Sequence, residues 1–600
     1  MLKTRQSREF WLLAVVALLV LGAGLGLRDP WPADEPRFVL VAKQMWESGD
    51  WWFPHRGQEL YSDKPPLYFW LLGASYALVR NWTVAFLLPS LLAALGTLWL
   101  TFDLGRRLWD RRAGLWAAAA VLCAFQFAYQ AKRAQIDPTV VFFITLGFYG
   151  LGRHLLLGPH WRWFWAGCFA AGLGVITKGV GFLALLALLP YAWMRWRDWK
   201  GLSAPAPRGA GRWALGAVAF LAAIGLWLGP MLWMALSDGD PAHRTYVQDL
   251  LFRQTATRYA DPWHHTQPAW YFARVVAVSW LPFSLLLPWL FKPWREAWRA
   301  RDARVLWPLA TCVLVVLFFT MSAGKRDMYI LPALPMLALA AAPFLDGLLE
   351  RRGVRGALFA LALLLGLGLF AAGVAALAGE PRFELKLEAG RGMPAGHDGL
   401  WWALAAMGAA LAGAALWLQP LRAVAVTAVM TAVLWCGWGL AIAPQLDGES
   451  SSRDLMREAR DLAGPGTEVG LVAWREQNLL QARGPTVEFG FTRTPVQQWN
   501  AAVAWAAAAP GARVLFVREV PELADCLQRT RVQSVGVANR RTWSLVWPGA
   551  VPVDCRRLPE SVDPEREAAP ATTQVSGGLS PDRHRAAGSP PAARSAAATA

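Results

Sequence analysis

Long apolar runs without a single charge constrain this chain more than any other feature. Residues 10–27, 84–102, 356–379 and 399–421 contain no Asp, Glu, Lys or Arg. A helix needs about 20 apolar residues to cross a hydrocarbon core of roughly 30 Å, so these runs are typical of membrane-spanning helices. A composition of 55% hydrophobic and 17% charged residues agrees and excludes an ordinary soluble protein.

The sequence predicts an α-helical polytopic membrane protein with about 13 transmembrane helices. They are expected at 10–27, 84–104, 113–130, 138–156, 162–176, 179–196, 213–235, 269–291, 305–321, 328–346, 356–378, 399–418 and 423–443. Residues 66–79 are apolar but short and follow two prolines, so we expect a juxtamembrane or re-entrant helix there.

The charges of the loops predict the orientation. The net charge of +17 does not indicate nucleic-acid binding, because the basic residues gather in short loops beside membrane lipids. With a cytoplasmic N-terminus, the loops 105–112, 195–212, 291–304 and 349–355 lie inside, and all are rich in arginine, as the positive-inside rule requires. No small-residue cleavage site follows Leu27, so we expect a retained first helix.

The composition changes after Pro444 and divides the chain into a transmembrane domain at 1–443 and two further parts. Residues 444–559 alternate helix-like stretches with short apolar runs (EVGLVAW, ARVLFVREV, WSLVWP), which predicts a small extracytoplasmic α/β domain. Cys526 and Cys555 both fall there; the sequence leaves open whether they form a disulfide. Residues 560–600 are rich in Ala, Pro, Ser and Gly and are predicted to be disordered.

The chemically distinctive stretch is 31–66, in the first outside loop, 28–83. It begins with adjacent acids, Asp34 and Glu35, just beyond the first span, and closes on Asp63-Lys64-Pro65-Pro66. Adjacent acids also occur as helix N-caps or solvated juxtamembrane charges. Proline after Lys64 favours an extended backbone, which suits a lysine held at the membrane rim for a lipid phosphate; a snorkelling lysine is the alternative.

This loop resembles the first extracytoplasmic loop of the polytopic lipid-linked-sugar glycosyltransferases of the GT-C class. These are the aminoarabinose transferases of lipid A and the related protein O-mannosyltransferases. The resemblance implies that Asp34 is the essential acid, with Glu35 beside it, and that Lys64 contacts the carrier phosphate. The aminoarabinose transferases usually show Glu-Lys-Pro where this chain has Asp63-Lys64-Pro65, so the carboxylate is one methylene shorter.

Further motifs fit the same resemblance. Asp137, before Pro138, matches an acid at the outer end of the fourth helix; an ordinary N-cap is the alternative. Thr177-Lys178-Gly179 and the segment from Lys325 and Arg326 to Tyr329-Ile330-Leu331-Pro332 match family signatures, and membrane-rim lysines are the alternative for both. The resemblance therefore assigns donor binding to a set of residues: Lys64, Lys178, Arg258, Lys325, Arg326 and Tyr329.

A metal site is a further expectation. His265 lies three residues before Pro268 and an aromatic pair, as in the family, and with Asp63 it supplies two ligands for a divalent cation, zinc or Mg/Mn. Two ligands alone are a weak signal, because catalytic zinc sites use three protein ligands. Interfacial histidines, His264 and His265, are the alternative.

The implied activity is that of a membrane glycosyltransferase. It would transfer a sugar from a polyprenyl-phosphate carrier to a periplasmic acceptor, lipid A or another envelope glycan or lipid, with inversion, at the bacterial inner membrane. Protein O-mannosylation on Ser or Thr is the first alternative. A lipid or solute transporter is the second, although it would place polar residues near the middle of the membrane and not at one rim.

Overall fold

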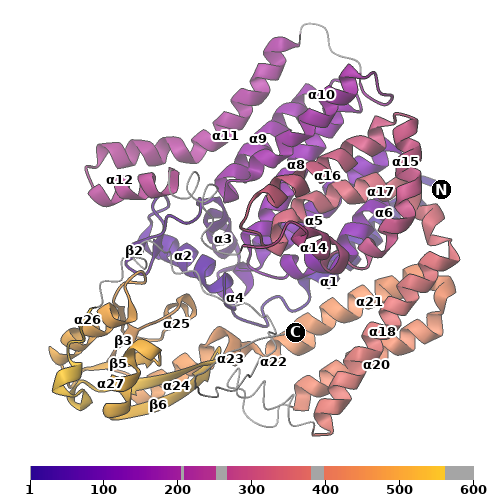
Figure 1. Cartoon of the computed structure of the whole chain (residues 1–600). Coiled ribbons are helices and arrows are strands. Elements are labelled where there is room, and N and C mark those ends of the chain that lie inside the picture. Colours follow the sequence, from indigo (N-terminus) through magenta and orange to yellow (C-terminus); the bar gives the residue numbers. More distant parts are fainter. Residues whose placement is uncertain (1, 204–208, 252–265, 380–397, 561–600) are drawn as a thin grey trace, which may run out of the picture. The chain divides into compact units, whose positions relative to one another are not determined.

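The structure is a computed structural model that describes residues 2–203, 209–251, 266–379 and 398–560 (Figure 1). Helices dominate it. The helices of the first half outside the first loop are α1 (Leu2–Gly22), α5 (Leu88–Leu108), α6 (Arg111–Cys123), α7 (Phe125–Ala131), α8 (Ile136–Leu155), α9 (Trp161–Lys178), the 3₁₀-helix η1 (Gly181–Ala187), α10 (Leu188–Trp196) and α11 (Ala210–Ser237).

The second half of the membrane part continues in the same way. Its elements are α12 (Pro241–Gln248), α14 (Tyr271–Ser279), η3 (Phe283–Leu286), α15 (Leu287–Arg299), α16 (Ala303–Met321), η4 (Asp327–Ala333), α17 (Leu334–Leu349), α18 (Arg352–Leu377), α20 (Asp398–Leu418), η5 (Pro420–Arg422), α21 (Ala423–Gly437), η6 (Trp438–Ile442) and α22 (Ala443–Gln445). α18 packs along α20 and α21, and α16 packs on α17.

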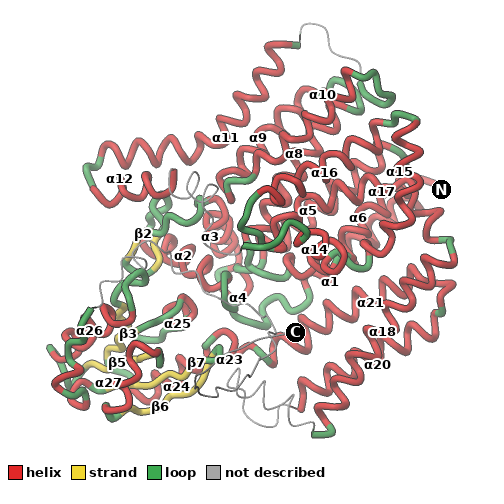
Figure 2. The backbone as a smooth tube through the Cα atoms, in the orientation of Figure 1, coloured by secondary structure: helices red, strands yellow, loops and turns green. Residues whose placement is uncertain are grey.

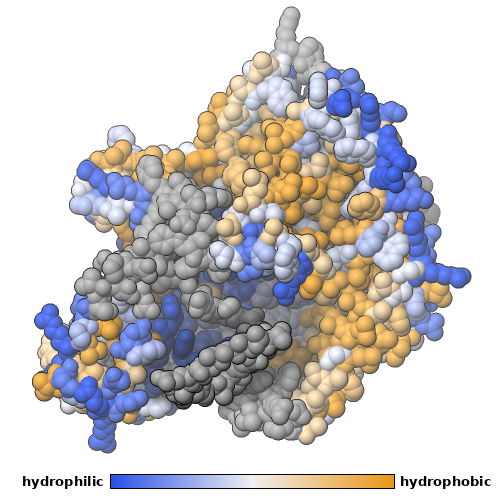
Figure 3. Space-filling view, in the orientation of Figure 1, coloured by the Kyte–Doolittle hydropathy of each residue, from blue (hydrophilic) through white to orange (hydrophobic). Residues whose placement is uncertain are grey.

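The chain is a helical, multi-pass membrane protein. Within the described residues, seven helices are long and apolar enough to cross a membrane, or up to nine if each of two bent helix pairs is one span. Each of the 13 apolar segments predicted from the sequence contains helix, but several are too short or too polar to meet that test. Large apolar side chains lie exposed on α11, α18 and α20, and Figure 3 shows the apolar surface over the helices.

α8 organises the interior of the membrane part. Nearly all of its residues are buried, and it contacts α5 and α9 along its length. The close approach of α8 to α9 depends on glycine, because a Cβ on Gly150 would lie 2.3 Å from the backbone oxygen of Trp163 in α9. Because α8 is held so closely, the residues at its two ends are placed firmly.

The first outside loop contains α2 (Glu35–Ser48), a hairpin of β1 (His55–Arg56) and β2 (Glu59–Leu60), α3 (Leu67–Val79) and the short α4 (Trp82–Ala85). α2 has Asp34 at its N-cap position and Pro36 in its first turn. It ends at Gly49, whose positive φ of 74° suits glycine and lets its N–H bond Met45. α3 is the helix predicted at 66–79.

The C-terminal region is the predicted α/β structure (Figure 2). Its helices are α23 (Asp447–Ser451), α24 (Arg453–Ala463), α25 (Glu476–Leu480), α26 (Pro495–Ala507) and α27 (Ala524–Arg529). Its strands are β3 (Glu468–Val472), β4 (Thr486–Glu488), β5 (Arg513–Arg518), β6 (Val532–Ala538) and β7 (Arg541–Val546).

The five strands form one mixed sheet in the order β4-β3-β5-β7-β6. β3 runs parallel to β4 and β5, whereas β7 runs antiparallel to β5 and β6. Cys526 and Cys555 form a disulfide, which answers the question that the sequence left open. The boundary predicted at 443/444 stays a prediction, and the predicted tail lies outside the described residues apart from Glu560.

Candidate active site

Asp34 is an acid of the first loop whose carboxylate is only weakly hydrogen-bonded. Its carboxylate accepts hydrogen bonds from Arg326 Nη2 at 3.2 Å and Gln135 Nε2 at 3.4 Å, and Arg37 Nη1 lies at 3.9 Å. These contacts come from three different segments of the chain, and all are long. With its side chain 14% exposed, Asp34 retains acceptor capacity for another group.

The pKa of Asp34 indicates its charge. Burial raises this pKa, but Arg326, Arg37, Arg133 and the hydrogen bond from Gln135 together lower it by more. The pKa therefore lies below its ordinary value, and Asp34 is a carboxylate at neutral pH. A carboxylate of low basicity orients a nucleophile and stabilises positive charge better than it removes a proton.

Glu35 has a different environment from its neighbour. Its side chain is wholly buried and accepts bonds from Arg28 at 2.6 and 2.8 Å, from the N–H of Trp31 at 2.8 Å and from the N–H of Ala134 at 2.9 Å. These bonds occupy both oxygens. The catalytic role predicted for Glu35 stays a prediction, and its contacts are those of a residue that positions the loop carrying Asp34.

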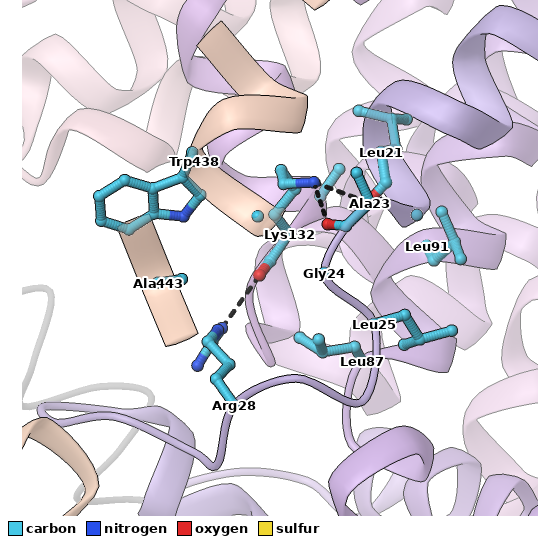
Figure 4. Close-up of a pocket in the computed structure, with 13 residues that line it drawn as sticks. Leu21, Ala23, Gly24, Leu25, Arg28, Leu87, Leu91, Lys132, Trp438 and Ala443 are labelled. Carbon is cyan, nitrogen blue, oxygen red and sulfur yellow. Dashed lines mark hydrogen bonds between the residues drawn. The ribbon is translucent and has the colours of Figure 1, made fainter. Parts of the chain in front are cut away.

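Arg28 and Lys132 extend this support, as the close-up in Figure 4 shows. The Lys132 ammonium donates to the carbonyls of Leu21 at 3.3 Å and Ala23 at 2.7 Å near the end of α1. The Lys132 carbonyl accepts from Arg28 at 3.0 Å. The end of α1, the loop before α8 and the Asp34 loop are thereby tied together.

Asp137 and Lys178 form the second half of the site. α8 begins at Ile136 with Gln135 as its N-cap, so Asp137 lies in the first turn and not at the cap position considered from the sequence. The Lys178 ammonium forms an ion pair with Asp137 and lies 5.1 Å from the ring centroid of Tyr329. Lys178 ends α9, and Gly179 follows as its C-cap with a φ of 81°, a conformation that favours glycine.

Arg326 joins the two halves. It pairs with Asp34; burial lowers the pKa of Arg326, but Asp34, Tyr329 and Asp137 together raise it, so these groups lie near its guanidinium. Asp34, Asp137, Lys178, Arg326 and Tyr329 therefore lie in one cluster, called the outer cluster below. Lys325, the next residue, instead buries its ammonium against the carbonyl of Gln267 at 3.0 Å.

Asp63 and Lys64 lie just before α3, and their link to the outer cluster runs through Tyr61 and Arg37. The Lys64 ammonium donates to the carbonyl of Asp63 at 2.9 Å, and Pro66 is the N-cap of α3. Burial, with the nearby Asp63 carboxylate, raises the pKa of Tyr61, while Arg37 opposes the shift. Arg37 also lies near Asp34, so Tyr61 and Arg37 connect the Asp63-Lys64 turn to the outer cluster.

Two predicted residues, Arg258 and His265, lie outside the described residues, and so does His264. Only one of the two predicted metal ligands, Asp63, is therefore seen. Within the described ranges no group of three His, Cys, Asp or Glu side chains could hold a metal ion. The metal site stays a prediction.

Several residues of the site were not identified from the sequence as parts of it. Gln135 contacts Asp34 and Arg28 contacts Glu35, whereas Lys132 is joined to them through Arg28 and Tyr61 is near enough to Asp63 for its charge to act. Tyr61 has a buried hydroxyl without a hydrogen-bond partner among the described residues, so it is available to a ligand. Its one sequence signal is its place two residues before Asp63.

Comparison with solved structures decides the fold. The crystal structure of ArnT from Cupriavidus metallidurans bound to undecaprenyl phosphate superposes with a TM-score of 0.67 at 20% identity, over 89% of this chain and 97% of that one. The chain has the GT-C fold. The apo form of the same protein gives the same TM-score over 90% of this chain. The resemblance drawn from the motifs is confirmed.

Sequence comparisons agree over part of the length. Residues 63–226 match the family model described as dolichyl-phosphate-mannose-protein mannosyltransferase. The undecaprenyl phosphate-alpha-4-amino-4-deoxy-L-arabinose arabinosyl transferase of Pseudomonas aeruginosa (strain LESB58) is 31% identical over 54% of this chain. Transferase 2 of Sodalis glossinidius is 29% identical over 56%. The match spans 58% of the length of each of these curated relatives.

Proposed function

We propose that this GT-C protein is a glycosyltransferase that moves a sugar from a polyprenyl-phosphate carrier to an acceptor at the outer face of a bacterial inner membrane. The observation that carries the proposal is the outer cluster, in which two acids and two cations from four separate segments meet at one end of the helices. The undecaprenyl-phosphate complex of the structural neighbour supports a carrier of that class.

The chemistry follows from the charges. An inverting displacement at the anomeric carbon breaks the bond to the carrier phosphate and forms the bond to the acceptor oxygen. The leaving phosphate gains charge, which fixed cations stabilise without reorganisation. We assign this role to Lys64, Lys178 and Arg326, and also to Arg258, because guanidinium binds phosphate oxygens in bidentate fashion. Asp34, ionised and incompletely bonded, orients the acceptor group, and Asp137 holds Lys178.

We propose lipid A or another envelope glycan or lipid as the acceptor, as the resemblance to the aminoarabinose transferases of lipid A implies; the names of the curated relatives support a sugar donor on undecaprenyl phosphate. An acceptor phosphate is already ionised and needs orientation more than a base, which suits the low pKa of Asp34. A serine or threonine acceptor, as the name of the matched family model suggests, would need a stronger base.

We further propose that the N-terminus is cytoplasmic and the C-terminal region periplasmic. The disulfide between Cys526 and Cys555 supports this, because such bonds persist in the periplasm and not in the cytosol. A periplasmic C-terminal region places the outer cluster on the same side, since Arg37 of α2 pairs with Glu476 of α25 at 2.8 Å.

The test is a reconstituted transfer reaction. Purified protein would be given a polyprenyl-phosphate aminosugar with lipid A in one reaction and with a Ser/Thr-containing peptide in another, and the products weighed by mass spectrometry. We expect the mass of one sugar residue on lipid A and none on the peptide. Transfer to the peptide alone would favour O-glycosylation of protein, and absence of transfer to either would contradict the proposal.

A further inference from the structure

Arginines gather at one edge of the C-terminal sheet, apart from the outer cluster. Arg475 follows β3, Arg518 ends β5 and Arg541 begins β7. Because β3 and β5 are parallel and β7 is antiparallel to β5, these three positions meet at the same edge. In open α/β sheets the carboxyl ends of parallel strands are the usual place for ligand binding.

Two of these arginines, Arg518 and Arg541, also share a face of the sheet. Arg518 lies directly opposite Trp543 in the β5–β7 register, and Arg541 precedes Trp543 by two residues, so Arg518, Arg541 and Trp543 point to one side of the sheet. Trp543 belongs to a buried core that includes Leu40 of α2. Arg475 lies near the first outer loop, since the charges of Arg37 and Arg56 act on it.

The outer loop contributes a fourth arginine, Arg56 of β1. The Phe491 ring lies 3.8 Å from the Arg56 guanidinium carbon and 6.0 Å from that of Arg475. Arg56 is only 8% exposed, yet its Nε has no hydrogen-bond partner among the described residues. The Nε of Arg518 is buried and unpartnered in the same sense. Buried polar groups are normally hydrogen-bonded, so both Nε groups can still donate to a ligand.

The acids nearby do not balance the charge. Glu476 is committed to Arg37 at 2.8 Å and lies 3.7 Å from Arg56, while Glu522 is the acid that acts on Arg518. Burial, with the like charges of Arg475 and Arg541, lowers the pKa of Arg518 to about 10. The fold thus holds a partly buried excess of positive charge.

We propose that Arg56, Arg475, Arg518 and Arg541, the sheet-edge cluster, bind a phosphate group of the acceptor that is remote from the reacting group. Guanidinium binds phosphate oxygens in bidentate fashion, which explains arginine at all four positions. The inference rests on the proposed function for the acceptor, and adds that acceptors carrying a second phosphate are preferred.

A binding experiment tests the site without relying on transfer. Full-length protein saturated with undecaprenyl phosphate would be titrated with inorganic pyrophosphate, and the thermal unfolding midpoint recorded. The cluster variant is Arg518→Gln with Arg541→Gln. The control, Arg556→Gln with Arg557→Gln, removes the same charge from exposed arginines beside the disulfide. We expect the pyrophosphate Kd to rise about tenfold or more in the cluster variant alone.

The same experiment separates binding from a structural role. Without pyrophosphate, the cluster variant should unfold at or above the wild-type midpoint, because like charges are removed. A lower midpoint with unchanged pyrophosphate affinity would overturn the proposal, and so would equal loss of affinity in the control.

Steady-state transfer identifies the source of the phosphate. With an acceptor bearing two phosphates, the cluster variant should show a KM raised about tenfold and a kcat within about twofold of wild type. With a one-phosphate acceptor its KM should match wild type. Unchanged KM for both, with pyrophosphate binding lost, would mean that the cluster takes free phosphate and would overturn the acceptor assignment. If wild-type protein transfers to neither acceptor, the proposed function fails, while the titration still decides whether the cluster binds phosphate.

Discussion

Two aspartate clusters lie at opposite ends of α8 and differ in how fully their carboxylates are hydrogen-bonded. At the outer end, Asp137 and Asp34 meet Lys178 and Arg326. At the other end, roughly 24 Å away at about 1.5 Å per residue, Arg153 contacts Tyr149, which donates to Asp103. Both clusters combine aspartate with basic and aromatic residues.

The clusters differ in how fully the aspartate oxygens are hydrogen-bonded and in which parts of the chain supply the partners. Asp103 is 3% exposed and accepts short bonds from Arg106 at 2.7 Å, Arg107 at 2.5 Å and Tyr149 at 2.6 Å. Both arginines come from its own helix. Asp34 makes longer bonds to partners from distant segments and keeps acceptor capacity. We infer that Asp103 fixes the packing of α5 on α8, whereas Asp34 is held ready for a ligand.

Glu35→Gln should have the largest effect, on stability. Both carboxylate oxygens of Glu35 are fully hydrogen-bonded, as in Asp103, although Glu35 is next to Asp34 in the sequence. Its replacement leaves the buried Arg28 without a charge partner. We expect a loss of about 3–5 kcal/mol in the free energy of unfolding. The matched control on α2 is Glu47→Gln, since that side chain is 60% exposed. Equal unfolding midpoints for the two variants would break the comparison.

Arg326→Gln should lower the rate of transfer and leave the fold intact. Its guanidinium is the cation that links Asp34 to the Asp137–Lys178 pair, and its side chain is 37% exposed. Loss of one preorganised charge-stabilising group costs roughly 10²–10³-fold in kcat. The measurement is single-turnover transfer with bound donor; a rate within threefold of wild type would remove Arg326 from the site.

Replacing Cys526 and Cys555 with serine should destabilise the C-terminal region by about 2–4 kcal/mol, because the disulfide constrains the unfolded chain. Thermal unfolding of the variant measures the effect. If the C-terminal region is periplasmic, reduction of the disulfide should change the electrophoretic mobility of the protein. Fully reduced Cys526 and Cys555 in freshly isolated cells would contradict this orientation, and with it the outer position of Asp34.

Arg112→Ala should change the unfolding free energy by no more than about 1 kcal/mol, because its ion pair with Asp346 is exposed. The pair belongs to neither aspartate cluster. A larger loss would show that the clusters at the two ends do not hold the main ionic contributions to stability.

The pH dependence should be the smallest effect. The folded pKa of Asp34 is below its unfolded value of about 3.9, so the stability it contributes is present above that pH and lost as pH falls through the folded pKa. Between about pH 7 and pH 5 Asp34 stays ionised. Transfer should therefore show no titration of this acid in that interval; a fall with a midpoint near pH 6 would contradict the assigned charge.

The sequence predicted the elements better than their contacts. The apolar runs marked the helices, and EVGLVAW, ARVLFVREV and WSLVWP became β3, β5 and β7. β4 and β6 were not predicted. The β4 sequence, TVE, is short, and the β6 sequence, VQSVGVA, lies at the sheet edge with only its last residue buried.

The candidate site was predicted in part. Asp34, Asp137, Lys178, Arg326 and Tyr329 come together as expected from loops assigned to one side. The difference between Asp34 and Glu35 could not be predicted, since it depends on Arg28 and on the N–H of Ala134, a hundred residues away in the chain. Local patterns carry no information about such pairings.

The central claim is tested most directly by measuring transfer rate and thermal unfolding for Asp34→Asn and Asp103→Asn side by side. We predict that Asp34→Asn loses roughly 10²–10⁴-fold in rate at an unchanged unfolding midpoint. Asp103→Asn should unfold at a lower temperature but transfer within about tenfold of wild type while folded, because its carboxylate only joins helices. The opposite pattern, a nearly active Asp34→Asn and a stable but inactive Asp103→Asn, would contradict the account.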